Sequence, residues 1–164
     1  MGVLSDNLVR VHDDTRLIIC SYQNSSAIQL AKLSGLSPII TTASLKHTNL
    51  LKSLGATDVI DRNASLSDEV RKIIDQPITI VYDSISGAET QQAGLDLLAP
   101  RGKIVVITSP TIKSDEKEIL RVVGQLSTPA YVELFQTLYG QKLAGLLERG
   151  LIKVSVQREV VWEV

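Results

Sequence analysis

The chain has 164 residues, 44% of them hydrophobic and 21% charged, which fits one domain with a single core. The formal net charge is −1 and the cationic residues are scattered, so nothing favours nucleic acid or an anionic membrane as a partner. The only cysteine, Cys20, excludes an intrachain disulfide and a cysteine-based zinc site, and we expect no metal. The single thiol, an N-terminus unlike a signal peptide and the lack of ~20 consecutive apolar residues predict a soluble cytoplasmic protein.

Short β-rich runs alternate with helical patterns after a tail of fifteen residues, and this rhythm is typical of βαβ units. The runs are apolar throughout rather than at every second position, which indicates strands covered on both faces. We therefore predict one α/β domain over residues 16–164, with a doubly wound parallel sheet and helices on both of its faces. The predicted strands are residues 16–20, 38–42, 58–61, 79–83 and 103–108.

Apolar residues at helical spacing predict the connecting helices. Gly35 and Gly55 stand just past two of them, where a left-handed residue is favoured, and residues 86–89 have the Ser-x-x-Glu form of a capping box. Gly102 is expected to turn the chain into the fifth strand. The predicted helices are residues 25–34, 45–54, 67–74 and 87–98.

After residue 108 the pattern loosens, and we expect a charged patch with a possible short helix. A long helix is predicted over residues 129–149, with Thr128 as its N-cap and Gly150 just past its end. Residues 151–156 are expected to open another strand.

The polar residues that follow the second predicted strand are the most informative about function. In a dinucleotide-binding sheet, an acidic residue at this point selects the free 2′-hydroxyl of NAD. This chain has no acid there and instead offers Thr42, Ser44, Lys46 and His47 at the start of a helix. Hydroxyls, cationic side chains and helix amides suit a phosphate, so we predict binding of NADPH.

Four segments resemble the cofactor domain of the medium-chain dehydrogenase/reductase superfamily. The resemblance is strongest to its zinc-independent quinone reductases and to fungal trans-acting enoyl reductases. It implies a Rossmann fold, NADPH, and metal-free hydride transfer to an activated C=C bond or a quinone, with a small molecule as substrate. The segments are AIQLAKLSG, TTASLKHTNLLKSLGATDVID, YDSISG and LLAPRGKIVVI, and residues 126–156 resemble the helix and strand that follow them in the family.

The resemblance also implies positions for the cofactor. Thr42, Ser44, Lys46 and His47 map onto the family's 2′-phosphate turn, and Arg62 takes the place of an aromatic residue near the adenosine. The residues expected beside the nicotinamide half are Ser84, Ile85, Thr108 and Ser109. Those left to contact the pyrophosphate are Ser21, Asn24 and Ser25, whereas no catalytic residue is identified.

Three departures from the family pattern leave a second hypothesis open. Residues 20–26 contain no glycine where the family has a glycine-rich loop, the family's N-terminal catalytic domain is absent, and the chain stops early. The alternative is a non-catalytic truncated remnant, or a nucleotide- or partner-binding module, that self-associates through a sheet edge.

Two further residues at strand ends have competing interpretations. Cys20 could be a nucleophile, but we predict a buried structural thiol because no helper motif accompanies it. Asp83 could form an acid/base pair with Tyr82, but a strand-end aspartate more often caps the next turn.

Overall fold

The computed structural model describes residues 15–20, 25–122, 132–133 and 135–154. Its centre is one parallel sheet with the strand order β3-β2-β1-β4-β5-β6. This is the order of a Rossmann fold, as predicted, and the chain reverses its direction of winding between β1 and β4. The strands are β1 (Leu17–Cys20), β2 (Ile39–Ala43), β3 (Asp58–Asp61), β4 (Ile78–Asp83), β5 (Leu98–Val106) and β6 (Glu118–Arg121).

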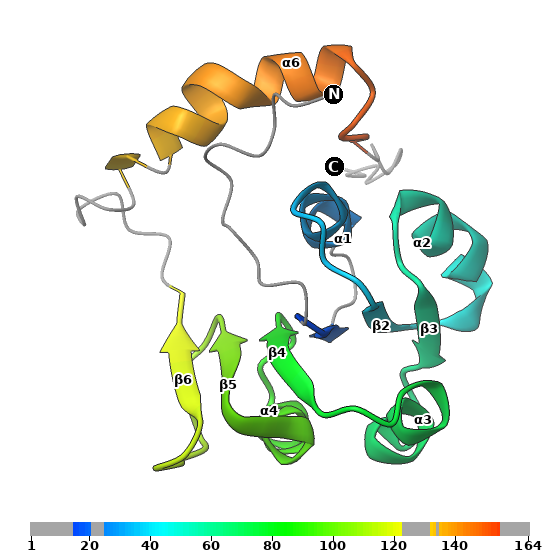
Figure 1. Ribbon diagram of the computed structural model, residues 1–164, viewed down its shortest axis with the longest axis vertical. Helices are drawn as coiled ribbons and strands as arrows, with labels where there is room; N and C mark the ends of the chain where they lie inside the picture. The colour runs from blue at the N-terminus through cyan, green and yellow to red at the C-terminus, as the bar shows by residue number, and fades with distance from the viewer. Residues whose placement is uncertain (1–14, 21–24, 123–131, 134, 155–164) are drawn as a thin grey trace, which may run out of the picture.

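Helices cover both faces of the sheet, as the continuous apolar strands require. Figure 1 shows α1 and α2 on one face and α3 and α4 on the other. Alternate residues of β1 enter two separate cores: Ile19 packs with α1 and α2, and Ile18 packs with the α3 and α4 side. The bounds are α1 (Ser25–Leu33), η1 (Leu45–His47), α2 (Thr48–Leu54), α3 (Leu66–Ile73) and α4 (Ala88–Leu97).

The C-terminal helical segment lies apart from the sheet, above α1 in Figure 1. It comprises a π-helix, η2 (Gln136–Lys142), which continues into α6 (Leu143–Glu148). The chain then returns to α1, where Gln29 donates to the Lys153 carbonyl (3.1 Å) and accepts from the Lys153 amide (2.6 Å). A buried glutamine therefore fixes the end of this segment on α1.

Several local predictions are confirmed and others are wrong. Gly35, Gly55 and Gly150 all have positive φ angles just past a helix. The predicted capping box does not form, because Gly87 is the N-cap of α4 and no side chain caps it. The predicted helix over residues 45–54 is divided into η1 and α2, and residues 151–154 contain no strand. Residues 128–131 and 155–156 lie outside the described parts.

The two largest corrections concern β5 and β6. Strand β5 begins at Leu98 rather than at residue 103, and its left-handed residue is Arg101 (φ +62°). Glycine is needed at position 102 for a different reason: the Ala99 backbone approaches it closely, and a Cβ there would lie 2.9 Å from the Ala99 carbonyl oxygen. The region predicted as a charged patch with a short helix contains β6, which pairs with β5 from Lys103 opposite Glu118 onward.

Candidate functional site

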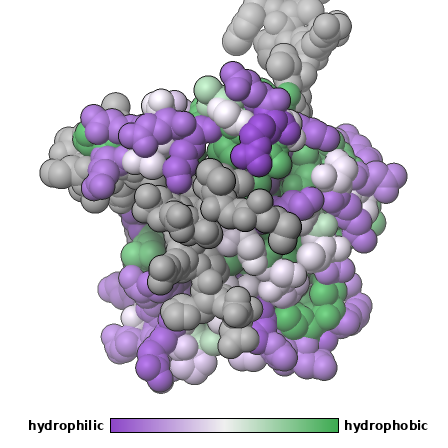
Figure 2. All heavy atoms as spheres, turned by 45° about the horizontal axis from the view of Figure 1, so that its top comes forward, coloured by the Kyte–Doolittle hydropathy of each residue, from purple (hydrophilic) through white to green (hydrophobic). Residues whose placement is uncertain are grey.

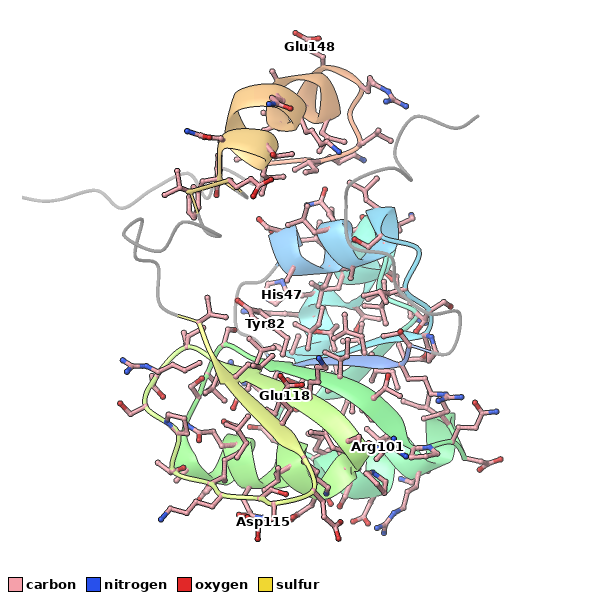
Figure 3. The ribbon with its side chains drawn as sticks, turned by 60° about the vertical axis from the view of Figure 1, so that its left-hand side comes forward. His47, Tyr82, Arg101, Asp115, Glu118 and Glu148 are labelled. Carbon is pink, nitrogen blue, oxygen red and sulfur yellow. The ribbon has the colours of Figure 1, made fainter. Side chains whose placement is uncertain are left out.

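The candidate site is the carboxyl-terminal edge of the sheet, where the chain leaves β1 for α1 and β4 for α4. In open α/β sheets, ligands bind outside the carboxyl ends of the strands where the winding reverses, which here is between β1 and β4. Figure 3 places His47 and Tyr82 towards this edge, and Arg101 and Asp115 towards the opposite one. The predicted site residues that the structure describes divide into groups after β2 and β3, and after β4 and β5.

The first group surrounds the end of β2. Lys46 and His47 are exposed on η1, and Ser44 is half-buried at its N-cap without a side-chain capping hydrogen bond. The Arg62 amide donates to the Ala43 carbonyl (3.0 Å), so the residue after β3 lies against the start of η1. Four of the five residues predicted for the adenosine end therefore come together. This arrangement concentrates cationic side chains beside a helix start.

Thr42 is the exception in this group. It is buried, and its side chain forms a hydrogen bond with Cys20, which directs it towards β1 rather than towards solvent. We therefore remove Thr42 from the proposed phosphate contacts.

The second group follows β4 and β5. Ser84 is half-buried, and its hydroxyl donates to the Cys20 carbonyl (3.2 Å), while Thr108 and Ser109 are exposed. Ile85 is half-buried against the core and its amide donates to Asp83 (3.0 Å), so its N–H is not available to a ligand. Ser25 is the first residue of α1, between the two groups. Ser21 and Asn24 lie outside the described residues.

Asp83 caps the turn after β4, which confirms its predicted structural role. Its carboxylate is fully buried and accepts hydrogen bonds from the amides of Ile85 (3.0 Å) and Ser86 (2.8 Å) and from the Thr90 hydroxyl (2.7 Å). A carboxylate held in this way by three donors orders the start of α4 and has no contact with the outside of the molecule.

A buried polar cluster behind this turn was not predicted. Ser86 and Gln91 are both buried, and Gln91 is fully enclosed although it lies on a helix. Gln91, Gly94 and Leu95 are spaced so that they lie on one face of the predicted helix, and this spacing indicates that Gln91 faces the sheet. The sequence does not show what Gln91 contacts, because most of its partners lie about 17 to 20 residues further along the chain.

Cys20 is a buried thiol, as predicted. Burial, and to a smaller extent the nearby Asp83 carboxylate, raises the pKa of Cys20 to about 12, with the hydrogen bond to Thr42 acting in the opposite direction. A thiol with such a pKa is almost wholly protonated near neutral pH and is a poor nucleophile.

The raised pKa of Cys20 predicts a loss of stability at high pH. Between pH 9 and about pH 12 the unfolded chain releases the thiol proton and the folded chain retains it. The free energy of unfolding should therefore be unaffected by this group below pH 9 and should fall by about 1.4 kcal/mol per pH unit above it. Urea unfolding from pH 8 to pH 11 of the native chain and of Cys20→Ala checks this. Equal slopes in the two proteins would contradict the burial of the thiol.

Two absences hold for the described parts of the chain. No helix there is long and apolar enough to cross a membrane. Nor do three or more His, Cys, Asp or Glu side chains gather in a group that could hold a metal ion. In the view of Figure 2, hydrophilic side chains cover most of the described surface, and hydrophobic residues show between them.

The sheet order, the covered faces and the polar strand ends together define a dinucleotide-binding type of fold. Comparison with known families places the chain more narrowly: residues 25–136 match the family model described as zinc-binding dehydrogenase. Because this match covers more than half of the chain, the protein belongs to that family, within the predicted medium-chain dehydrogenase/reductase superfamily.

Individual relatives agree with the family. The trans-enoyl reductase FSL5 of Gibberella zeae is 49% identical over 67 residues, which are 40% of this chain and 18% of that protein. The quinone oxidoreductase of Pseudomonas aeruginosa is 29% identical over 143 residues, 80% of this chain and 44% of that protein. The Escherichia coli quinone oxidoreductase, solved in complex with NADPH, has a TM-score of 0.72 at 22% identity and covers 92% of this chain. The chain spans half of that structure and less than half of these two curated relatives.

Proposed function

We propose that this chain binds NADPH and is the cofactor-binding part of an oxidoreductase of the enoyl reductase or quinone reductase type. The observation that carries the proposal is the end of β2, where Ser44, Lys46 and His47 stand in place of an acidic residue. Relatives named as trans-enoyl reductases and quinone oxidoreductases support the reaction class. A location in the cytoplasm, independence from zinc and association through a sheet edge stay predictions.

The described residues fit the phosphate-bearing end of NADPH. The 2′-phosphate would lie beside η1, where the Ser44 hydroxyl can donate a hydrogen bond and Lys46 and His47 offer positive charge. Arg62 is placed beside them by its main-chain bond to Ala43 and would reach the phosphate or cover the adenine. Ser25 at the start of α1 would face the pyrophosphate.

The chemistry follows from the cofactor. NADPH, when bound, supplies a hydride to an activated C=C bond or to a quinone. This chain binds and orients the cofactor. The residues after β2 hold the adenosine end of NADPH, and the loops after β4 and β5 hold its nicotinamide end, on the far side of β1.

Replacement of Lys46 by glutamine tests the phosphate site. We expect the native chain to bind NADPH with micromolar affinity and NADH much more weakly in calorimetric titrations. Lys46→Gln should weaken NADPH binding by about tenfold and leave NADH binding unchanged, because a charge-assisted contact at an exposed site contributes about 1.5 kcal/mol.

The matched control is Lys52→Gln, which removes the same charge from an exposed position on α2. It should leave the affinity for NADPH within a factor of two. A folded chain that binds neither dinucleotide would refute the proposed function. NADPH binding without turnover of enones or quinones would favour the nucleotide-binding module.

A further inference from the structure

The most heavily hydrogen-bonded buried side chain at the candidate site is Gln91 on α4. It is fully buried between the helix and the ends of β4 and β5. Burial of a side-chain amide is unfavourable unless its donors and acceptor find partners. The partners of Gln91 therefore indicate what its burial achieves.

Gln91 contacts the loops that follow both strands. Its Nε2 donates to the Ser86 carbonyl (3.0 Å), in the loop after β4, and approaches the Thr108 hydroxyl (3.5 Å) and the Ser109 carbonyl (3.4 Å), in the loop after β5. Its Oε1 accepts from the Thr111 amide (2.8 Å) and from the Thr111 hydroxyl (3.1 Å). One side chain thus fixes the distance between two loops that are separate in the sequence.

Ser86 forms a second link between the same loops. Its hydroxyl donates to the Asp83 carbonyl (2.7 Å) and accepts from the Ile107 amide (2.9 Å), and its carbonyl accepts from the Thr108 hydroxyl (3.0 Å). Ser86 does this with a φ of +52°, an unfavourable angle for a residue with a Cβ. The surrounding hydrogen bonds offset that backbone strain.

The cluster is buried behind the loops, whereas their outer side is open. Thr108, Ser109 and Thr111 are exposed residues even though each contacts the enclosed Gln91 amide. The loop after β5 is therefore accessible from outside, while its spacing from the loop after β4 is set by bonds on its inner side. Loops held in this way lose little freedom when a ligand binds them.

We propose that Gln91 is a positioning residue, which holds the loops after β4 and β5 at the spacing that receives the nicotinamide half of the dinucleotide. This inference rests on the proposed function, because that function supplies the ligand. Gln91 itself is enclosed and does not touch the cofactor; it acts through Ser86, Thr108, Ser109 and Thr111.

Calorimetry with NADPH and with adenosine 2′,5′-bisphosphate isolates this effect, because the second compound lacks the nicotinamide half. In Gln91→Met the affinity for the bisphosphate should be unchanged and the affinity for NADPH should fall about tenfold. Gln92→Met is the control, since Gln92 is an exposed neighbour on α4 whose amide pairs with Asp96 (2.7 Å). It should leave both affinities unchanged.

Amide hydrogen exchange of the ligand-free chain gives a second readout. The Thr111 amide should exchange slowly in the native chain and rapidly in Gln91→Met, because its acceptor is lost. Gln29→Met removes another buried and hydrogen-bonded amide, at the α1 contact with Lys153, and should leave Thr111 protected. If Gln91→Met does not fold, Gln91→Glu serves, since it keeps the acceptor for Thr111 and loses both donations to main-chain oxygens; it should show the same loss of NADPH affinity.

The outcomes separate the two proposals. A folded Gln91 variant with native affinities for both ligands would overturn the positioning role. Retention of slow exchange at Thr111 in Gln91→Met would also overturn it. Binding of neither ligand by the native chain would instead refute the proposed function, and the exchange experiment would still decide whether Gln91 orders the two loops.

Discussion

Asp83→Ala is expected to lower the free energy of unfolding by about 3–5 kcal/mol. The change removes the shared acceptor of the Ile85 and Ser86 amides and the Thr90 hydroxyl, each of which lies within 3.0 Å of the carboxylate. An unsatisfied buried donor costs about 1–3 kcal/mol. The two amides lose their acceptor together, and the Thr90 hydroxyl keeps only the Gly87 carbonyl (3.1 Å). Urea unfolding followed by far-ultraviolet circular dichroism measures the loss.

Asp83→Asn separates the charge of the side chain from its hydrogen bonding, because asparagine has nearly the same size and shape. Its amide oxygen can still accept from the two main-chain amides, and its NH₂ group can donate to the Thr90 hydroxyl, which then donates only to the Gly87 carbonyl (3.1 Å). We expect a loss below about 1.5 kcal/mol. Equal losses for the alanine and asparagine variants would show that the charge of Asp83, rather than its capping geometry, stabilises the turn.

The sheet was the most predictable part of this chain. Its central strands carry runs such as Leu17–Cys20, buried at every residue, and a strand that is apolar on both faces can lie only inside a doubly covered sheet. The helices between the strands followed from spacing, and their ends from Gly35 and Gly55. These features depend on residues close together in the sequence.

Strand β6 could not be predicted because it depends on a distant part of the chain rather than on a local pattern. Its four residues are exposed or half-buried and show no buried stripe. Its existence depends on pairing with β5, reinforced by an ion pair between Lys103 and Glu118 (2.9 Å). Pairing with a strand some 15 residues away overrides weak local preference at a sheet edge.

The candidate site also has one part that local sequence predicts and one part that depends on distant contacts. The chemistry after β2 follows from residue types alone, since the absence of an acid and the presence of Lys46 and His47 need no partner to be recognised. The ordering of the loops after β4 and β5 depends on Gln91, whose role exists only because α4 brings it to Thr111. Helical spacing indicated which face of α4 is buried, but not that a polar residue there joins two loops.

The close packing of α4 on the sheet leads to a second large expected effect of a single substitution. Gly94 lies where α4 crosses β4 and β5, and a Cβ there would lie 2.9 Å from Val81 Cγ1 and 3.1 Å from Ile104 Cδ1. Both neighbours are fully buried, so neither can withdraw into solvent. We expect Gly94→Leu to lower the free energy of unfolding by about 3 kcal/mol or more, because the core must expand to accept four carbons.

Gly145→Leu is the matched control, since Gly145 is also helical and a Cβ there would meet no neighbouring atom within 4 Å. There the better helix propensity of leucine should leave the chain as stable or up to about 1 kcal/mol more stable. If Gly94→Leu still folds, α4 must move outward, and the Gln91 contact with Thr111 should loosen with it. The Thr111 amide would then exchange faster in Gly94→Leu than in Gly145→Leu, which would tie the close packing of α4 to the order of the loops at the candidate site. Similar stability and exchange in both variants would contradict this packing.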